Sequence, residues 1–153
     1  MDRATERAIE WDCTQLIHDF YLCLDEKRYA DLLDLFAADG AWVRLGTELK
    51  GRAQIAEAMS ERDHWVTAHV VSNVRVRVVD ETSAHSTQYI TLYRHEGATA
   101  ASGPVAVVPP LGLLRHQDTL VRVGEQWRFQ RKTSRAIMVD RDRVTHYDRA
   151  QGR

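Results

Sequence analysis

A change of character near residue 66 constrains the fold of this chain more than any other feature. Before it, apolar residues recur at helical spacing, most clearly in residues 8–25, which contain no Pro or Gly. After it come four segments rich in β-branched and aromatic residues, at 66–79, 83–95, 111–123 and 126–139. Helices followed by a run of antiparallel strands predict an α+β fold, with the helices on one face of a sheet.

The N-terminal part is predicted to hold three helices with short connections. After the helix at 8–25, residues 26–36 predict a second, shorter helix and residues 52–62 a third. Between them, "AADGAW" is interpreted as a break in which Gly40 takes a positive φ, "AWVRL" as a short strand and "GTELKG" as a turn. Residues 97–110 contain two glycines and all three prolines, so they predict a long functional loop.

Length, charge and hydropathy limit the partners. The 153 residues suit a single domain, 1–153, with a charged tail at 140–153 that we expect to be loosely ordered. A net charge of −1 predicts no binding to nucleic acid or to an anionic membrane. No apolar run approaches the ~20 residues of a membrane helix. The N-terminus lacks the apolar core of a signal peptide, so a cytoplasmic location is predicted.

Neither a metal nor another cofactor is predicted. Cys13 and Cys23 would lie roughly 15 Å apart on one helix, beyond the reach of a disulfide or a shared metal. We therefore expect two free thiols. None of the seven histidines occurs in an HxH, HxxxH or HExxH pattern. The glycine motifs of nucleotide-binding, phosphate-binding and serine-hydrolase sites are also absent from the sequence.

The stretch "TAHVVSNVRV", residues 67–76, places a histidine and an asparagine on one face of a predicted strand. Strict alternation puts His69, Val71 and Asn73 on that face. The opposite face is then made of Val70, Ser72, Val74 and Val76. The residues alone leave open which face looks inward, because the apolar one could equally pack on the helices.

Four stretches, in this order and spacing, resemble the SnoaL-like family of the nuclear transport factor 2-like superfamily over nearly the whole chain. They are "LCLDEKRYADLLDLFAADGAW", "GRAQIAEAM", "TAHVVSN" and "DTLVRVGEQWRFQRK". The resemblance implies a cone-shaped α+β barrel in which three N-terminal helices pack on a strongly curved antiparallel sheet. It also implies a pocket at the wide end of the cone, with the His69 face turned inward.

Scytalone dehydratase, bile acid 7α-dehydratase and hexachlorocyclohexane dehydrochlorinase, which belong to this superfamily, are similar to this chain at two positions. Each has an aspartate near the end of the first helix and a histidine at the start of the long strand, which correspond here to Asp25 and His69. The implied roles are a histidine base and an aspartate that orients it. The alternatives are a solvated aspartate that ends a helix and a structural histidine.

Further polar and aromatic residues are candidates for substrate binding in this pocket. Tyr21 shares a helix face with Asp25, Trp42 shares a strand face with Arg44, and Asn73 follows His69 on its predicted face. The complete set of candidate substrate-binding residues is Tyr21, Trp42, Asn73, Tyr89, His116 and Arg135.

The resulting functional hypothesis is a cofactor-free lyase or isomerase, dehydratase-like, acting on a small hydrophobic cyclic or polycyclic substrate. The alternative is a non-catalytic ligand-binding or subunit-type protein, such as the small subunit of ring-hydroxylating dioxygenases. A homo-oligomer is predicted, with a trimer favoured and a dimer next. The reason is that a row of valines (Val70, Val74, Val76 and Val78), or the row facing the other way, would be exposed in a monomer.

Overall fold

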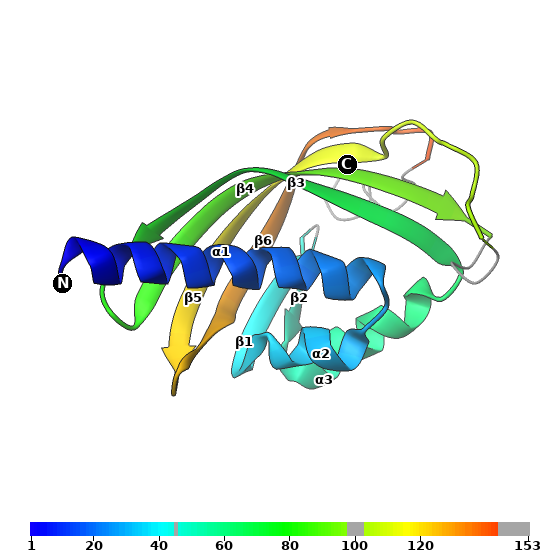
Figure 1. The fold of residues 1–153 in the computed structure, drawn as a ribbon. Coiled ribbons are helices and arrows are strands. Elements are labelled where there is room, and N and C mark those ends of the chain that lie inside the picture. Colours follow the sequence, from blue (N-terminus) through cyan, green and yellow to red (C-terminus); the bar gives the residue numbers. More distant parts are fainter. Residues whose placement is uncertain (45, 98–102, 144–153) are drawn as a thin grey trace.

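The computed structural model describes residues 1–44, 46–97 and 103–143. Within them the chain is α+β, with its helices before residue 63 and one six-stranded sheet (Figure 1). The elements are α1 (Arg3–Asp25), α2 (Tyr29–Asp34), β1 (Phe36–Arg44), β2 (Thr47–Lys50), α3 (Gly51–Met59), the single 3-10 turn η1 (Ser60–Arg62), β3 (Trp65–Val78), β4 (Ser83–Glu96), β5 (Gly112–Val123) and β6 (Gln126–Val139).

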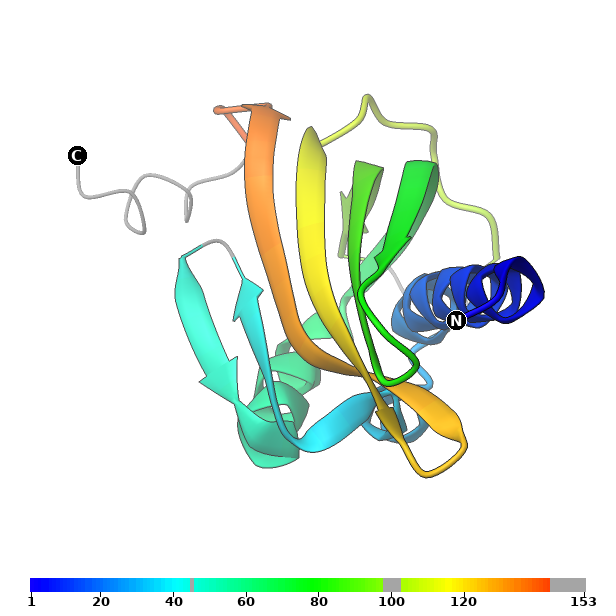
Figure 2. The ribbon, with the colours of Figure 1, turned by 90° about the vertical axis from the view of Figure 1, so that its left-hand side faces the viewer.

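The sheet is strongly curved, and α1 crosses one of its faces while α2 and α3 lie near β1 (Figures 1 and 2). Its strand order is β2-β1-β6-β5-β4-β3. The core forms where α1 meets this face. Phe20 is fully buried there and lies edge-on to the rings of Tyr21, Trp42 and Phe129 at centroid separations of 5.0, 5.2 and 5.5 Å. The predicted helix-on-sheet arrangement is confirmed.

Helix α1 begins at Arg3, five residues before the predicted start. Asp2 caps it, because its carboxylate accepts the backbone N–H of Thr5 at 2.8 Å. The extension was not predicted because its first turns carry few apolar residues. The second helix is shorter than predicted and covers only Tyr29–Asp34. Cys13 and Cys23 are buried free thiols, as predicted.

The segment after α2 corrects three sequence interpretations. Residues 36–44 form the strand β1 rather than a break followed by a short strand, and 47–50 form β2 rather than a turn. Gly40 does not have a positive φ. It is needed for a close approach, because a Cβ there would lie 2.7 Å from the carbonyl oxygen of Phe129 on β6. The sheet is also not wholly antiparallel, since β1 runs parallel to β6.

A β-bulge at Asn73 divides β3 into two halves with opposite alternation. Ser72 pairs with Tyr89 and Arg75 with Thr87, so two residues of β3 oppose one residue of β4. Asn73 has a φ of 51°, in the left-handed region that asparagine tolerates better than most residues.

The bulge explains why both faces of the predicted strand looked suitable for the core. His69 and Val71 face inward before the bulge, and Val74, Val76 and Val78 pack on the core after it. The sequence left open which of two rows would be exposed, and of the valine row (Val70, Val74, Val76 and Val78) the last three residues are not. Val70 alone among them faces away, with 53% of its surface exposed.

Part of the predicted long loop and most of the charged tail lie outside the described residues. Residues 103–110 have no regular structure. Arg143 attaches the start of the tail to the segment before β5 and to β4. Its guanidinium donates to the carbonyl oxygens of Pro109 and Arg94 at 2.9 and 2.8 Å. Among the described residues, no helix has the length and apolar character needed to cross a membrane.

Candidate active site

A cavity of ≈ 90 Å³ lies between α1 and the sheet. Its walls come from α1, β1, η1 and β3–β6, so residues far apart in the sequence meet there. Aliphatic and aromatic side chains form much of the lining, and polar groups interrupt it at a few places. The polar or charged lining residues are Tyr21, Arg44, Arg62, Thr67, His69, Arg94, His116 and Ser134.

His69 lines this cavity, and Asp25, which does not line it, contacts the ring of His69. The Nδ1 of His69 lies 2.6 Å from Oδ1 of Asp25, and the backbone N–H of His69 donates to Oδ2 at 2.8 Å. The position of Asp25 at the last residue of α1 lets its carboxylate reach the start of β3. A carboxylate accepts hydrogen bonds only, so the shared proton resides on Nδ1 and leaves Nε2 of His69 with a free lone pair.

Two further residues hold the carboxylate of this pair in place. The hydroxyl of Thr67 donates to Oδ1 of Asp25 at 2.8 Å, and a guanidinium nitrogen of Arg62 donates to that hydroxyl at 3.0 Å. The sequence analysis missed both residues. Thr67 precedes His69 by two positions and therefore shares its strand face, which is a signal that could have been used. Arg62 gave no such signal.

The imidazole of His69 is held in its neutral form. Its side chain is only 7% exposed. Burial lowers its pKa below the usual 6.5, although the hydrogen bond and the charge of Asp25 act in the opposite direction. The positive charges of Arg62 and Arg44 lower this pKa further. A neutral imidazole with a free Nε2 is a competent general base near neutral pH.

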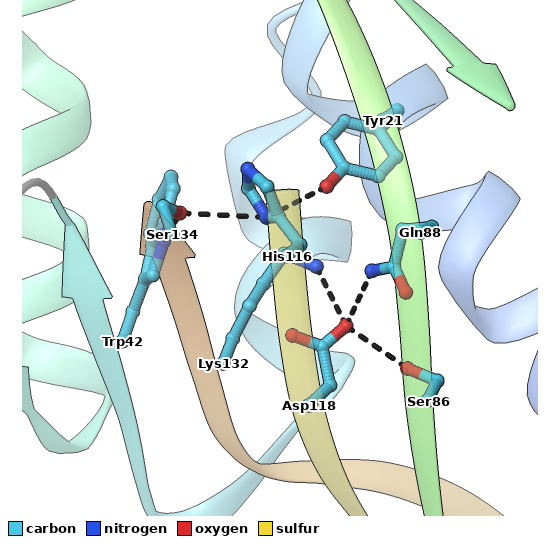
Figure 3. Close-up of polar contacts among 8 residues, drawn as sticks. All are labelled: Tyr21, Trp42, Ser86, Gln88, His116, Asp118, Lys132 and Ser134. Atoms are coloured by element: carbon cyan, nitrogen blue, oxygen red, sulfur yellow. Dashed lines mark hydrogen bonds and ion pairs between the residues drawn. The ribbon is translucent and has the colours of Figure 1, made fainter. Parts of the chain in front are cut away.

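A second imidazole, that of His116 on β5, lines the same cavity. Figure 3 shows its ring with Tyr21 on one side and Ser134 on the other. The hydroxyl of Tyr21 lies 2.9 Å from its Nδ1, and that of Ser134 lies 3.4 Å from the same atom. Trp42 donates its indole N–H to Ser134 at 3.3 Å, which leaves the Ser134 hydroxyl proton for His116. Hydroxyls can donate or accept; we assign the O–H of Tyr21 as the donor to Nδ1, which places the proton of His116 on Nε2.

The ionisation of Tyr21 and His116 supports this assignment. Burial and then the negative charge of Asp118 raise the pKa of Tyr21 well above its usual value, so its O–H remains a donor. Burial and then the positive charge of Lys132 lower the pKa of His116 well below 6.5, so it stays neutral. Its Nε2 is buried without a hydrogen-bond partner among the described residues. An N–H donor therefore remains unused at this site.

The positive charge that lowers the pKa of His116 is that of Lys132, which forms a buried ion pair with Asp118. Lys132 and Asp118 are 3.0 Å apart, and neither side chain is exposed. The side chains of Gln88 and Ser86 also donate to Asp118, at 2.7 and 3.3 Å (Figure 3). The ammonium of Lys132 lies 4.4 Å from the ring centre of Phe20. Hydrogen bonds and aromatic faces offset the desolvation of the two charges.

The structure brings some of the predicted site residues together and excludes others. His69, Tyr21, Trp42 and His116 line the cavity, whereas Asp25 contacts His69 without lining the cavity itself. Three predictions need correction, because Asn73, Tyr89 and Arg135 do not line it. Asn73 forms the bulge, while Tyr89 and Arg135 alternate with buried neighbours and face the other side of the sheet. The prediction failed because strand parity was assigned without the bulge and without the inward residues of β4 and β6.

Within residues 1–44, 46–97 and 103–143, no cluster of three or more His, Cys, Asp or Glu side chains has the geometry to hold a metal ion.

The chain belongs to the SnoaL-like domain family, whose sequence pattern matches residues 5–133. The match covers nearly all of the helices and all strands except the last part of β6, which contributes Ser134 and Val139 to the cavity wall. No curated protein sequence matched the chain.

Solved structures with the same fold include enzymes and proteins of unknown function. A provisionally named scytalone dehydratase from Novosphingobium aromaticivorans superimposes with a TM-score of 0.75 at 22% identity, covering 91% of each chain. A hexachlorocyclohexane dehydrochlorinase from Novosphingobium barchaimii gives 0.74 at 14% identity, covering 91% of this chain and 93% of the other. A protein of unknown function from Mycobacterium tuberculosis gives 0.72 at 24% identity, covering 99% and 88%. Similarity at this level of identity establishes the fold alone.

Proposed function

We propose that this protein is a cofactor-free lyase, dehydratase-like, that acts on a small, largely hydrophobic cyclic substrate in the cavity. One observation carries the proposal: two buried imidazoles line one largely apolar cavity, and their hydrogen-bond partners favour opposite tautomers. His69 offers a lone pair, and His116 offers an N–H. An elimination next to a carbonyl needs a base for the carbon-bound proton and a donor for the oxygen that gains charge.

In the proposed reaction, Nε2 of His69 removes a proton from the carbon beside a substrate carbonyl. The electron pair of the broken C–H bond moves toward the carbonyl oxygen, where the N–H of His116 stabilises the negative charge. Asp25 stabilises the imidazolium that forms on His69, as the orienting carboxylate does in hydrolase triads. The electron pair then returns to form the carbon–carbon double bond, and a β-hydroxyl leaves as water with the proton from His69.

The same two groups support an isomerisation if no leaving group is present. The imidazolium of His69 would then return its proton to a different carbon of the enolate, and the double bond would shift. Both reactions begin with the same proton abstraction. The first step is therefore the one to test while the substrate is unidentified.

Hydrogen–deuterium exchange at the α-carbon of simple cyclic ketones, followed by NMR in D₂O, measures this step without a leaving group. We expect the protein to accelerate exchange over buffer. Replacing His69 with Ala should abolish the acceleration, and replacing Asp25 with Asn should reduce it steeply. The double variant should be little worse than the poorer single one, because the two residues act as a unit.

His85, which lies exposed on the outer face of β4, provides the matched control. A His85→Ala variant should keep the full exchange rate. The elimination proposal would be rejected if the natural protein failed to accelerate exchange in a panel of cyclic ketones that includes ketones with and without a carboxylate, or if His69→Ala retained the rate. The non-catalytic, ligand-binding alternative would then describe this chain better.

A further inference from the structure

Three arginines, Arg44 on β1, Arg62 on η1 and Arg94 on β4, line the proposed active-site cavity. None of the described residues that line it is acidic. Two of them make cation–π contacts with Trp65, because the guanidinium carbons of Arg62 and Arg94 lie 5.6 and 4.6 Å from its ring centre. A hydrophobic substrate alone gives no reason for this concentration of positive charge.

The neighbours of these arginines do not neutralise the cluster. Within the described residues, Arg44 makes no hydrogen bond or ion pair, and its guanidinium only lies 5.8 Å from the ring centre of Trp42. Arg62 donates to the neutral hydroxyl of Thr67. Arg94 is bridged at 2.6 Å to Glu96, whose side chain is 57% exposed and therefore weakly effective as a counter-charge.

Burial makes this arrangement costly for the empty protein. Arg62 is only 5% exposed, and the Nε atoms of Arg62 and Arg94 are buried without hydrogen-bond partners among the described residues. Burial, together with the positive charges of Arg62 and Arg94, lowers the pKa of Arg44 to about 10, with only Glu61 acting in the opposite direction. Buried cations in proteins are ordinarily paired, but the part-buried carboxylate near these three guanidinium groups, that of Asp25, is reached within the described residues only through Thr67 and already accepts from His69.

We infer that the substrate carries a small oxyanion, a carboxylate or a phosphate, which the cluster of Arg44, Arg62 and Arg94 binds while the hydrophobic body fills the apolar part of the cavity. This inference rests on the proposed function, because it names the substrate class of the same site. Guanidinium groups suit the role, since their planar forks match carboxylate and phosphate oxygens.

The position of Arg62 ties the anion to the reacting atoms. Arg62 donates to Thr67, which donates to Asp25, so the cluster is two hydrogen bonds from the carboxylate that orients His69. The anion and the acidic carbon consequently belong to one compact molecule. The oxyanion would also offset the charges of Arg44 and Arg62 near His69 and make that base stronger when substrate is bound. The other titratable groups around His69 are Asp25, Tyr21 and His116.

Three probes of similar size test the inference in the intact protein: benzoate, phenyl phosphate and the neutral benzamide. Amide chemical shifts of Thr67 and His69, followed by NMR titration, report binding in the cavity without any turnover. We expect benzoate or phenyl phosphate to bind at least about tenfold more tightly than benzamide, as one well-placed charged hydrogen bond would provide. The anion that binds more tightly, benzoate or phenyl phosphate, shows whether the substrate's oxyanion is a carboxylate or a phosphate.

The Arg44→Met variant is the central test, because Arg44 makes no described hydrogen bond that its removal would break. It should lose most of the preference for the anion, whereas Arg44→Lys should keep part of it. Arg115→Met, on the exposed outer face of β5, is the matched control and should behave like the natural protein. Thermal unfolding of ligand-free Arg44→Met should occur at an unchanged or higher temperature, since a repelling charge is removed.

Benzamide binding as tightly as the anions, absence of millimolar binding by all three probes, or an unchanged anion preference in Arg44→Met would each overturn the inference. A lower unfolding temperature for Arg44→Met would also count against it, because Arg44 would then have a structural role. These results are independent of the exchange assay. Anion binding without proton exchange would reject the elimination proposal alone, and exchange without anion preference would reject only the substrate class.

Discussion

Asp25 accepts two hydrogen bonds from a single residue, His69, one from the ring Nδ1 at 2.6 Å and one from the backbone N–H at 2.8 Å. This double attachment fixes both the ring and the strand that carries it. The side chain of His69 therefore has one orientation and one tautomer relative to the end of α1. Precise placement of this kind is what a general base requires.

The two cavity histidines are expected to be neutral and to have opposite tautomers. Long-range ¹H–¹⁵N correlation spectra at neutral pH should show His69 protonated at Nδ1 and His116 protonated at Nε2. Replacing Tyr21 with Phe should weaken the preference of His116 for the Nε2-protonated tautomer. The tautomer of His69 should not change. Finding both rings protonated at the same type of nitrogen would contradict the assignment.

Acid should destabilise the folded protein through these same rings. The folded-state pKa values of His69 and His116 are lowered below the unfolded value of 6.5. The unfolded chain therefore binds more protons below that pH. The stability that each neutral ring contributes is complete above about 6.5 and is lost as the pH falls through its folded-state pKa, by up to about 1.4 kcal/mol per pH unit and proton.

Urea unfolding between pH 7 and pH 5 measures this slope. A His116→Asn variant should show a shallower fall in the free energy of unfolding, because one of the two linked protons is removed. His85→Asn changes an exposed histidine on the outer sheet face and should keep the slope of the natural protein. An equal slope in His116→Asn would show that His116 does not contribute to the acid sensitivity.

The bulge at Asn73 should tolerate glycine and resist β-branched residues. Its φ of 51° suits Gly, so Asn73→Gly should change the free energy of unfolding little. Asn73→Val should cost about 1–2 kcal/mol, the penalty of the left-handed conformation for such a side chain. Val70→Thr is the control, because Val70 is exposed and lies in regular strand backbone. Equal stability of the Val and Gly variants at position 73 would show that the bulge does not depend on this residue.

An apolar row on the outer sheet face supports the proposed homo-oligomer. Val70, Thr91, Leu113 and Met138 are paired in register across β3, β4, β5 and β6. Val70 and Met138 are 53% and 66% exposed in the single chain. Sedimentation at micromolar concentration should give a multiple of 17.6 kDa. Met138→Glu should shift the protein toward the 17.6 kDa monomer. A natural protein that already sediments at 17.6 kDa would reject the proposal.

The sequence predicted the later strands well because their signals are local. The ends of β3, β4, β5 and β6 fall within one residue of the predicted ones, where turn residues interrupt β-branched segments. The first half of β1 was missed because its Ala, Asp and Gly residues do not favour a strand, and long-range pairing with β6 determines its structure.

The candidate site was predictable only where a resemblance supplied its geometry. Asp25 and His69 were chosen on that basis, and the structure places them in contact. The arginine cluster depends on three segments that meet only in the folded chain, so no spacing in the sequence indicates it. Tyr89 and Arg135 were misplaced because strand alternation identifies a pair of faces without telling which one is enclosed.

Because of the extra residue at Asn73, the two halves of β3 have different structural roles. The half that carries His69 serves the cavity, and the half that carries Val74, Val76 and Val78 serves the packing against α1. Since the faces are reset between the halves, both sets of side chains can point to the interior from one continuous strand. Deleting the extra residue would turn one of the two sets to the outer face of the sheet.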